Sequence, residues 1–217
     1  MKRILSAHSG LRRAALLCAT AGYVDAYGYL GLGGVFPANM TGSTVLLGIA
    51  LARLEAHRVA IFAMTLGAFF LGAIIASLLK RIFARPPLAF VIAAILLLVA
   101  DTGTVQSETK LILLASAMGM QGASLARFNG ISMRTVVVTG TMLQIAEAIA
   151  GFTGLGRASG ATPSFHDLAI PAAGWLTYAL GAGISAALAG ILPMPMIVPA
   201  FVLVLIAADL ALHPNTP

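Results

Sequence analysis

Two acidic side chains, Asp25 and Glu147, lie inside apolar stretches of this 217-residue chain. A carboxylate in the hydrocarbon core of a bilayer is costly, so it must face a partner or a wet cavity. Such a group suits the binding of a proton or a cation. The alternatives are an interfacial or helix-packing role for Asp25 and an ion pair with a nearby arginine for Glu147.

Two Thr-Gly pairs form the second feature with chemical potential. Thr41-Gly42, preceded by Asn39, and Thr139-Gly140 each lie near the start of a short apolar segment. The N-terminus of a helix offers free N–H groups and the positive end of its dipole, and glycine permits close approach. Two such ends meeting in mid-membrane would bind an anion or a polar solute. The alternative is two ordinary N-caps, with the glycines used for helix packing.

Amide side chains add to the polar residues of the second half. Gln144 and Glu147 are three residues apart and share one helix face, and together with Gln121 they could line a path. Arg127 is interpreted as a boundary residue on the cytoplasmic side. The predicted solute-binding residues are Asp25, Asn39, Thr41, Gly42, Gln121, Thr139, Gly140 and Glu147.

Enzymatic and metal-binding patterns do not occur in the sequence. The four histidines have no second ligand at a useful spacing, and the single cysteine, Cys18, excludes an intrachain disulfide and a multi-cysteine metal site. No Gly-x-Ser-x-Gly, phosphate-binding loop or His-Glu-x-x-His motif is present. The sequence therefore predicts no catalytic residues, no metal and no cofactor.

Composition defines the class of protein that must position these residues. The chain is 59% hydrophobic and 9% charged, against roughly 25% charged residues in soluble domains. So few charges cannot cover a soluble surface, and the composition predicts an integral membrane protein. The net charge of +6 comes without any basic run longer than a pair. It therefore indicates membrane orientation and excludes a nucleic-acid partner.

The apolar stretches predict an all-α, polytopic membrane helix bundle with a single domain over residues 1–217. A spanning helix needs ~20 apolar residues. Six stretches fit: Ala14–Leu32, Val59–Leu79, Pro87 to about Val105, Leu111–Ala126, Ala169–Leu192 and Met196–Leu212. Segments 40–52 and 139–155 are shorter, and the first follows the Gly-rich, irregular stretch Gly31–Asn39. Each of the two is a full span, a half-helix or a re-entrant segment.

Ordered similarities between residues 11–105 and 110–212 indicate an internal repeat. Both halves close on an apolar segment of one form, since Pro87 lies 14 residues before Asp101 and Pro195 lies 14 before Asp209. The other matches are Gly22-x-x-Asp25 with Gly119-x-x-Gly122, Met40–Thr44 with Val138–Met142, and Gly67-Ala68 with Gly181-Ala182. Their common order predicts a duplication.

The basic residues favour an inverted orientation of the two halves. With six spans and a cytoplasmic N-terminus, ten of the 13 lysines and arginines lie on the cytoplasmic side. With eight spans the division is eight to five. The six-span arrangement fits the positive-inside tendency better and gives three spans to each half. The second half then enters the membrane from the opposite face, as in many secondary transporters.

The motifs of both halves resemble the YoaK-like family of bacterial inner-membrane proteins, whose domain has no assigned function. The resemblance covers nearly the whole chain, and its motif residues are Gly22, Asp25, Ala26, Met40, Thr41, Gly42, Thr44, Gly119, Gln121, Thr139 and Gly140. Ser43 stands where the family pattern has asparagine. A hydroxyl in place of an amide argues against a direct ligand role there. The resemblance implies a multi-span membrane protein and supplies no substrate.

These observations lead to two functional hypotheses of different classes. The first is a secondary transporter or channel-like carrier for a small solute or ion, with Asp25 as the coupling carboxylate. The second is a non-transporting membrane subunit or adaptor. The expected partners are the lipid bilayer and a small solute or ion, and a homo-oligomer is left open. The expected location is the inner (plasma) membrane, multi-pass, with a cytoplasmic N-terminus.

Overall fold

The computed structural model describes residues 2–83, 86–124, 138–152 and 165–212, and every regular element in them is an α-helix. The predicted all-α class is therefore confirmed. The helices are α1 (Lys2–Gly31), α2 (Met40–Ala52), α3 (Ala56–Phe83), α4 (Pro86–Ala100), α5 (Ser107–Ser124), α6 (Val138–Phe152), α7 (Phe165–Leu188) and α8 (Ile197–Leu212).

Local sequence explains where several helices begin and end. The stretch predicted to be irregular after α1 is non-helical over residues 32–39, with Gly33 and Gly34 at φ values of 80° and 78° that only glycine adopts readily. Helix α4 opens on a Pro-Pro pair, which is favourable in the first turn because proline lacks an N–H and an N–H there would have no helical acceptor. It ends at Ala100, before the predicted Val105, and the next residue, Asp101, accepts a hydrogen bond from the N–H of Met196, directly before α8.

Two helices within the described residues are long and apolar enough to cross a membrane, Ala56–Phe83 and Leu168–Leu188. Three more apolar helices are shorter, namely Met40–Ala52, Pro87–Ala100 and Ile197–Leu212. Helix α1 has 30 residues, of which the first part carries the basic residues of the N-terminus. Segment 40–52 is thus a short helix, as the sequence predicts. The segments Pro87 to about Val105 and Met196–Leu212, which the sequence predicts as full spans, also form helices of the shorter class.

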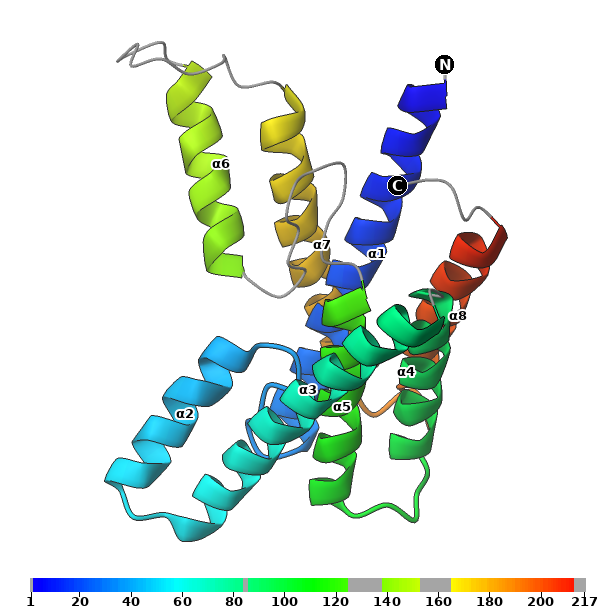
Figure 1. Ribbon diagram of the computed structural model, residues 1–217. Coiled ribbons are helices and arrows are strands. Elements are labelled where there is room, and N and C mark those ends of the chain that lie inside the picture. The colour runs from blue at the N-terminus through cyan, green and yellow to red at the C-terminus, as the bar shows by residue number, and fades with distance from the viewer. Residues whose placement is uncertain (1, 84–85, 125–137, 153–164, 213–217) are drawn as a thin grey trace.

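The helices run in two opposite directions (Figure 1). From their first to their last residues, α1, α2, α4 and α7 run down the picture, whereas α3, α5, α6 and α8 run up it. Helix α1 packs along α7, and α3 packs along α5. Helix α2 lies on α3, α6 lies on α7, and α4 packs against both α5 and α8. Helix α2 runs in the same direction as α1. The segment between them, residues 32–39, therefore first returns toward the middle of the molecule.

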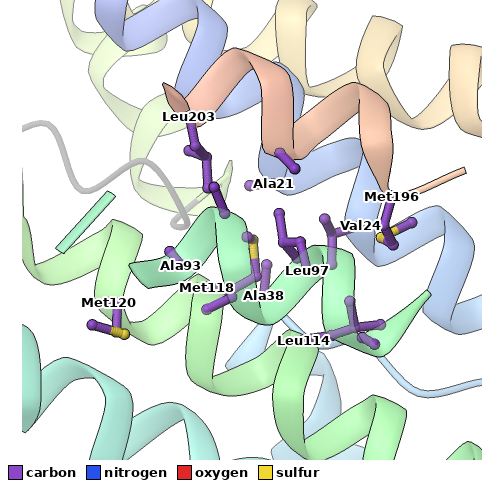
Figure 2. Close-up of a cluster of buried hydrophobic side chains, with 14 of the residues drawn as sticks. Ala21, Val24, Ala38, Ala93, Leu97, Leu114, Met118, Met120, Met196 and Leu203 are labelled. Carbon is purple, nitrogen blue, oxygen red and sulfur yellow. The ribbon is translucent and has the colours of Figure 1, made fainter. Parts of the chain in front are cut away.

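The core lies where α1, α4, α5 and α8 meet (Figure 2). Val24 from α1, Leu97 from α4, Met118 from α5 and Leu203 from α8 are each at most 1% exposed. Figure 2 shows these side chains directed toward one another. These side chains form the packed apolar core of the bundle.

Glycines set the contact between the two long helix pairs. A Cβ added at Gly22 would overlap the backbone carbonyl of Tyr178, and one at Gly181 would overlap that of Ala19. The α3–α5 crossing has the same construction, with Gly72 against Ser116 and Gly119 against Phe69. Small residues allow helix backbones to approach closely in lipid. At Gly67 an added Cβ meets nothing, so this glycine has no such role.

Candidate functional site

Asp25 lies at a junction of three elements and is 2% exposed. One carboxylate oxygen, Oδ1, accepts hydrogen bonds from the backbone N–H groups of Ala38 at 2.7 Å and Asn39 at 3.1 Å. The other, Oδ2, accepts one from the Tyr178 hydroxyl at 2.5 Å. The carboxylate thus joins α1 to the segment before α2 and to α7. Charge-assisted bonds of this kind compensate part of the cost of its burial.

The start of α2 is built on the same junction. Asn39 is the N-cap, and its side-chain oxygen accepts from the N–H of Gly42 at 3.1 Å. Ser43 is fully buried, and its hydroxyl donates to the carbonyl of Phe36 at 2.8 Å. These bonds hold segment 32–39 against the first turn of α2. The Asp25 carboxylate therefore lies beside a helix N-terminus, where the dipole favours negative charge.

Sequence reasoning missed the role of Tyr178, because no local signal links it to a carboxylate 153 residues earlier. We expect Tyr178→Phe to lower the free energy of unfolding by about 1–2 kcal/mol, since it removes one hydrogen bond to a buried charge. Unfolding in detergent micelles measures this change. The matched control is Tyr29→Phe, because Tyr29 is 53% exposed and phenylalanine keeps the ring that stacks on Phe36. Equal stability of the two variants would contradict the assignment.

The other predicted residues are distributed over separate parts of the fold. Thr41 is exposed in the first turn of α2, and Glu147 is exposed on α6. Gly140 is half-buried in the first turn of α6, and the side chain of Thr139 lies outside the described residues. Among the residues that the structure describes, α2 and α6 do not touch. The two Thr-Gly ends are therefore not joined in one site in this arrangement.

Gln121 connects α5 to α1. It is 2% exposed, and its side-chain Nε2 donates to the carbonyl oxygen of Leu17 at 2.8 Å. A carbonyl can only accept, so this bond also determines which amide atom is the oxygen. That oxygen, Oε1, is buried and has no hydrogen-bond partner among the residues that the structure describes. Gln121 therefore ties the two halves of the sequence together and leaves one acceptor available.

Comparison with known proteins identifies the family. A family described as "Protein of unknown function (DUF1275)" matches residues 13–209, which is most of the chain. This chain belongs to that family. The protein named "UPF0700 transmembrane protein YoaK" of Bacillus subtilis (strain 168) is 34% identical over 150 residues. The match covers 63% of this chain and 65% of that relative. No solved structure matches.

The predicted YoaK-like resemblance is thus confirmed, and the relative's printed name agrees with the membrane class that composition predicts. Two residues of the first-half motifs take part in the junction: Asp25 accepts the three hydrogen bonds, and the N–H of Gly42 donates to the side chain of Asn39. The departure from the pattern, Ser43, is used for an internal bond to Phe36.

Proposed function

We propose that this protein is a secondary carrier for a small solute or ion, with two inverted halves and Asp25 as the proton-binding group. The observation that carries the proposal is the position of Asp25, a buried carboxylate that ties α1, the start of α2 and α7 together. Buried ionisable groups at such positions in membrane proteins mark ion and substrate pathways. The partners in this proposal are the bilayer and the transported solute.

The directions of the helices support six spans and two re-entrant segments. If α2 crossed the whole membrane, α1 and α3 would run in the same direction, whereas they run in opposite ones (Figure 1). The same argument applies to α6, because α5 and α7 run in opposite directions (Figure 1). In this arrangement each short helix begins in the middle of the membrane and returns to the side from which its re-entrant segment entered. Half-helices of this kind are typical of transporter substrate sites.

The packing of the helices supports an inverted duplication. Replacing each helix by its partner four places along the chain converts the α1–α7 pair into α5–α3, and α2–α3 into α6–α7. It also converts α4–α5 into α8–α1, and it leaves α4–α8 as it is. In each of the four pairs of equivalent helices, the two members run in opposite directions in Figure 1. A two-fold axis in the membrane plane has this effect.

The contacts of the crossing glycines also fit the replacement of each helix by its partner four places along the chain. Gly22 and Gly119 are 97 residues apart, as are Ala19 and Ser116, whose carbonyls face the partner glycines. The equivalent of Gly181 in the first half is Gly72, which differs from the predicted pairing with Gly67. The reason is that Gly72 lies at the crossing, whereas Gly67 has open space beside it. The halves are therefore interlocked, because each long helix packs against one from the other half.

Proton binding at Asp25 provides a mechanism for coupling. A protonated carboxyl loses the charge that attracts the N–H groups of Ala38 and Asn39, and its own proton competes with that of Tyr178. Segment 32–39 and the first turn of α2 would then be released from α1. Weaker attachment of α1 to these elements would let one half move against the other, which is how carriers with inverted repeats alternate access.

Uptake into proteoliposomes tests this function. We expect inward proton movement, reported by an enclosed pH-sensitive dye, when an amino acid, sugar or monovalent cation from a panel is added outside. Asp25→Asn keeps the shape of the side chain but cannot bind the proton, so we expect proton movement to fall by about tenfold or more. Glu108→Gln is the control, because Glu108 is an exposed carboxylate at the start of α5. Unchanged proton movement in Asp25→Asn removes Asp25 from the mechanism.

A second candidate function, a non-transporting membrane subunit, is favoured by the packed apolar centre between α1, α4, α5 and α8. A subunit of this kind needs a rigid core and no path through it. Proteoliposomes that contain folded protein and move none of the solutes or protons tested favour this function. Co-purification of a partner from the native membrane then identifies what it assembles with.

A further inference from the structure

Helix α6 lies at the edge of the molecule and packs against one neighbour. Among the described residues, α7 is the only other helix that contacts it (Figure 1). The covered side chains of α6 recur at helical spacing, with Thr141 and Ile145 half-buried and Ala148 buried. The contact with α7 therefore uses one side of α6, and no other described helix covers the rest of it.

A second side of α6 is polar in its middle and carries glycine at both ends. The residues on it are spaced by four, three and four positions: Gly140, Gln144, Glu147 and Gly151. At 3.6 residues per turn they share one side of the helix, about 100° around from the side that contacts α7. Gly140 is half-buried, and the other three are exposed. We name these four residues the α6 stripe.

The α6 stripe does not suit a helix surface that contacts lipid. Among the side chains described on α6, the exposed polar ones are Gln144 and Glu147, and both lie in the stripe. Neither makes a hydrogen bond or an ion pair with the described residues. A carboxyl or carboxamide in hydrocarbon is costly, so such groups in membrane helices face other protein or water. The other large exposed side chains, such as Leu143 and Ile149, are apolar and do suit lipid.

The α6 stripe is complementary to a copy of itself. Alternating spacings of four and three residues are those of the seam between two helices that pack with knobs in holes. Glycine at both ends of the stripe lets two backbones approach closely in lipid. Between the glycines, the amide of Gln144 donates N–H groups and the carboxyl of Glu147 accepts them. Two copies inserted with the same orientation are related by a two-fold axis along the membrane normal, which makes their α6 helices parallel.

We infer that the α6 stripe is a homodimer interface, in which Gln144 of each copy donates to Glu147 of the other. In a parallel seam a side chain also contacts the neighbouring layer of the facing helix, which lies three residues or about 4.5 Å away along the axis. Both side chains are long enough to cover that distance. One proton shared between the two Glu147 carboxyls removes the repulsion between them. The inference uses the membrane class of the family and the surface of α6, and it does not depend on solute movement.

Cysteine cross-linking of the full chain in liposomes tests the interface. The protein carries Cys18→Ala and one new cysteine, either Gly151→Cys in the stripe or Ile149→Cys on the opposite side of α6. Gly151→Cys leaves the polar pair intact, and Ile149 is a matched control because it is 53% exposed on the same helix. With copper–phenanthroline as oxidant, we expect Gly151→Cys to form mostly covalent dimers and Ile149→Cys to stay monomeric. Equal cross-linking at the two positions, or none at position 151, overturns the inference.

The polar pair is tested without any cysteine in the stripe, by counting subunits in liposomes from single-molecule photobleaching. We expect Glu147→Leu to weaken dimerisation by about tenfold or more, because it removes the acceptors of both hydrogen bonds. Glu147→Gln keeps a hydrogen-bonding side chain and should restore most of the dimer. Ala146→Leu adds an apolar side chain away from the stripe and should change nothing. A monomeric wild type, or a Glu147→Leu variant that dimerises like the wild type, overturns the inference. Reaction of a monomeric Gly151→Cys protein with a water-soluble maleimide also overturns it, and assigns the stripe to a water-filled path.

Discussion

Replacing Asp25 by alanine is expected to lower the free energy of unfolding by about 3 kcal/mol or more. The N–H groups of Ala38 and Asn39 and the hydroxyl of Tyr178 would lose their common acceptor. Each buried polar group without a partner costs roughly 1–3 kcal/mol. Reversible unfolding in mixed detergent micelles measures the change.

Comparison with Asp25→Asn separates the hydrogen bonds from the charge. The asparagine oxygen still accepts from the two N–H groups, so we expect a loss of about 1 kcal/mol. Glu108→Ala removes an exposed carboxylate and should leave stability unchanged to within roughly 0.5 kcal/mol. If Asp25→Ala proved as stable as Glu108→Ala, the three-element junction would not exist in the folded protein.

Alanine at the crossing glycines is expected to destabilise the protein as strongly at one crossing as at the other. A Cβ at Gly22 would overlap the carbonyl of Tyr178, and a Cβ at Gly119 would overlap that of Phe69. The helices must move apart to admit it, which costs about 1–3 kcal/mol per site. We expect equal losses because the two glycines hold equivalent places in the proposed repeat. The same micellar unfolding measurement applies.

Two glycines on the partner helices of these crossings serve as controls. At Gly67 on α3 and Gly183 on α7 an added Cβ meets nothing within 4 Å. Alanine at these positions improves helix propensity by up to about 1 kcal/mol, so these variants should be as stable as the wild type or more stable. A loss at Gly22 without a matching loss at Gly119 would contradict the equivalence of the two crossings.

Much of the fold could be predicted from sequence because membrane helices are specified by local hydropathy. The apolar stretches from Val59 to Leu79 and from Met196 to Leu212 lie within or almost match helices α3 and α8. The irregular stretch before Met40 was predictable from its glycines and proline. Segment 40–52 forms the short helix that its length predicts. The scarcity of charge also directed attention to Asp25, because each buried charge in such a chain requires an explanation.

Partners between helices could not be predicted, because hydropathy carries no information about which apolar faces meet. Nothing near Asp25 in the sequence indicates Tyr178, and nothing near Arg13 indicates Asp209, to which its guanidinium binds. Periodicity also cannot distinguish Gly72, which lies at a helix crossing, from Gly67, which does not. These choices depend on where two helix backbones cross in space.

The sequence by itself thus determined the membrane class, the helical segments and the few polar residues that a bilayer does not explain. Only the tertiary structure decided that Asp25 binds α2 and α7 together, that the Thr-Gly ends of α2 and α6 stay apart in the described residues, and that long helices pair between the halves. The physical reason is that burial of apolar surface is a local tendency of each segment, whereas hydrogen bonds and close backbone contacts require a specific arrangement of several segments.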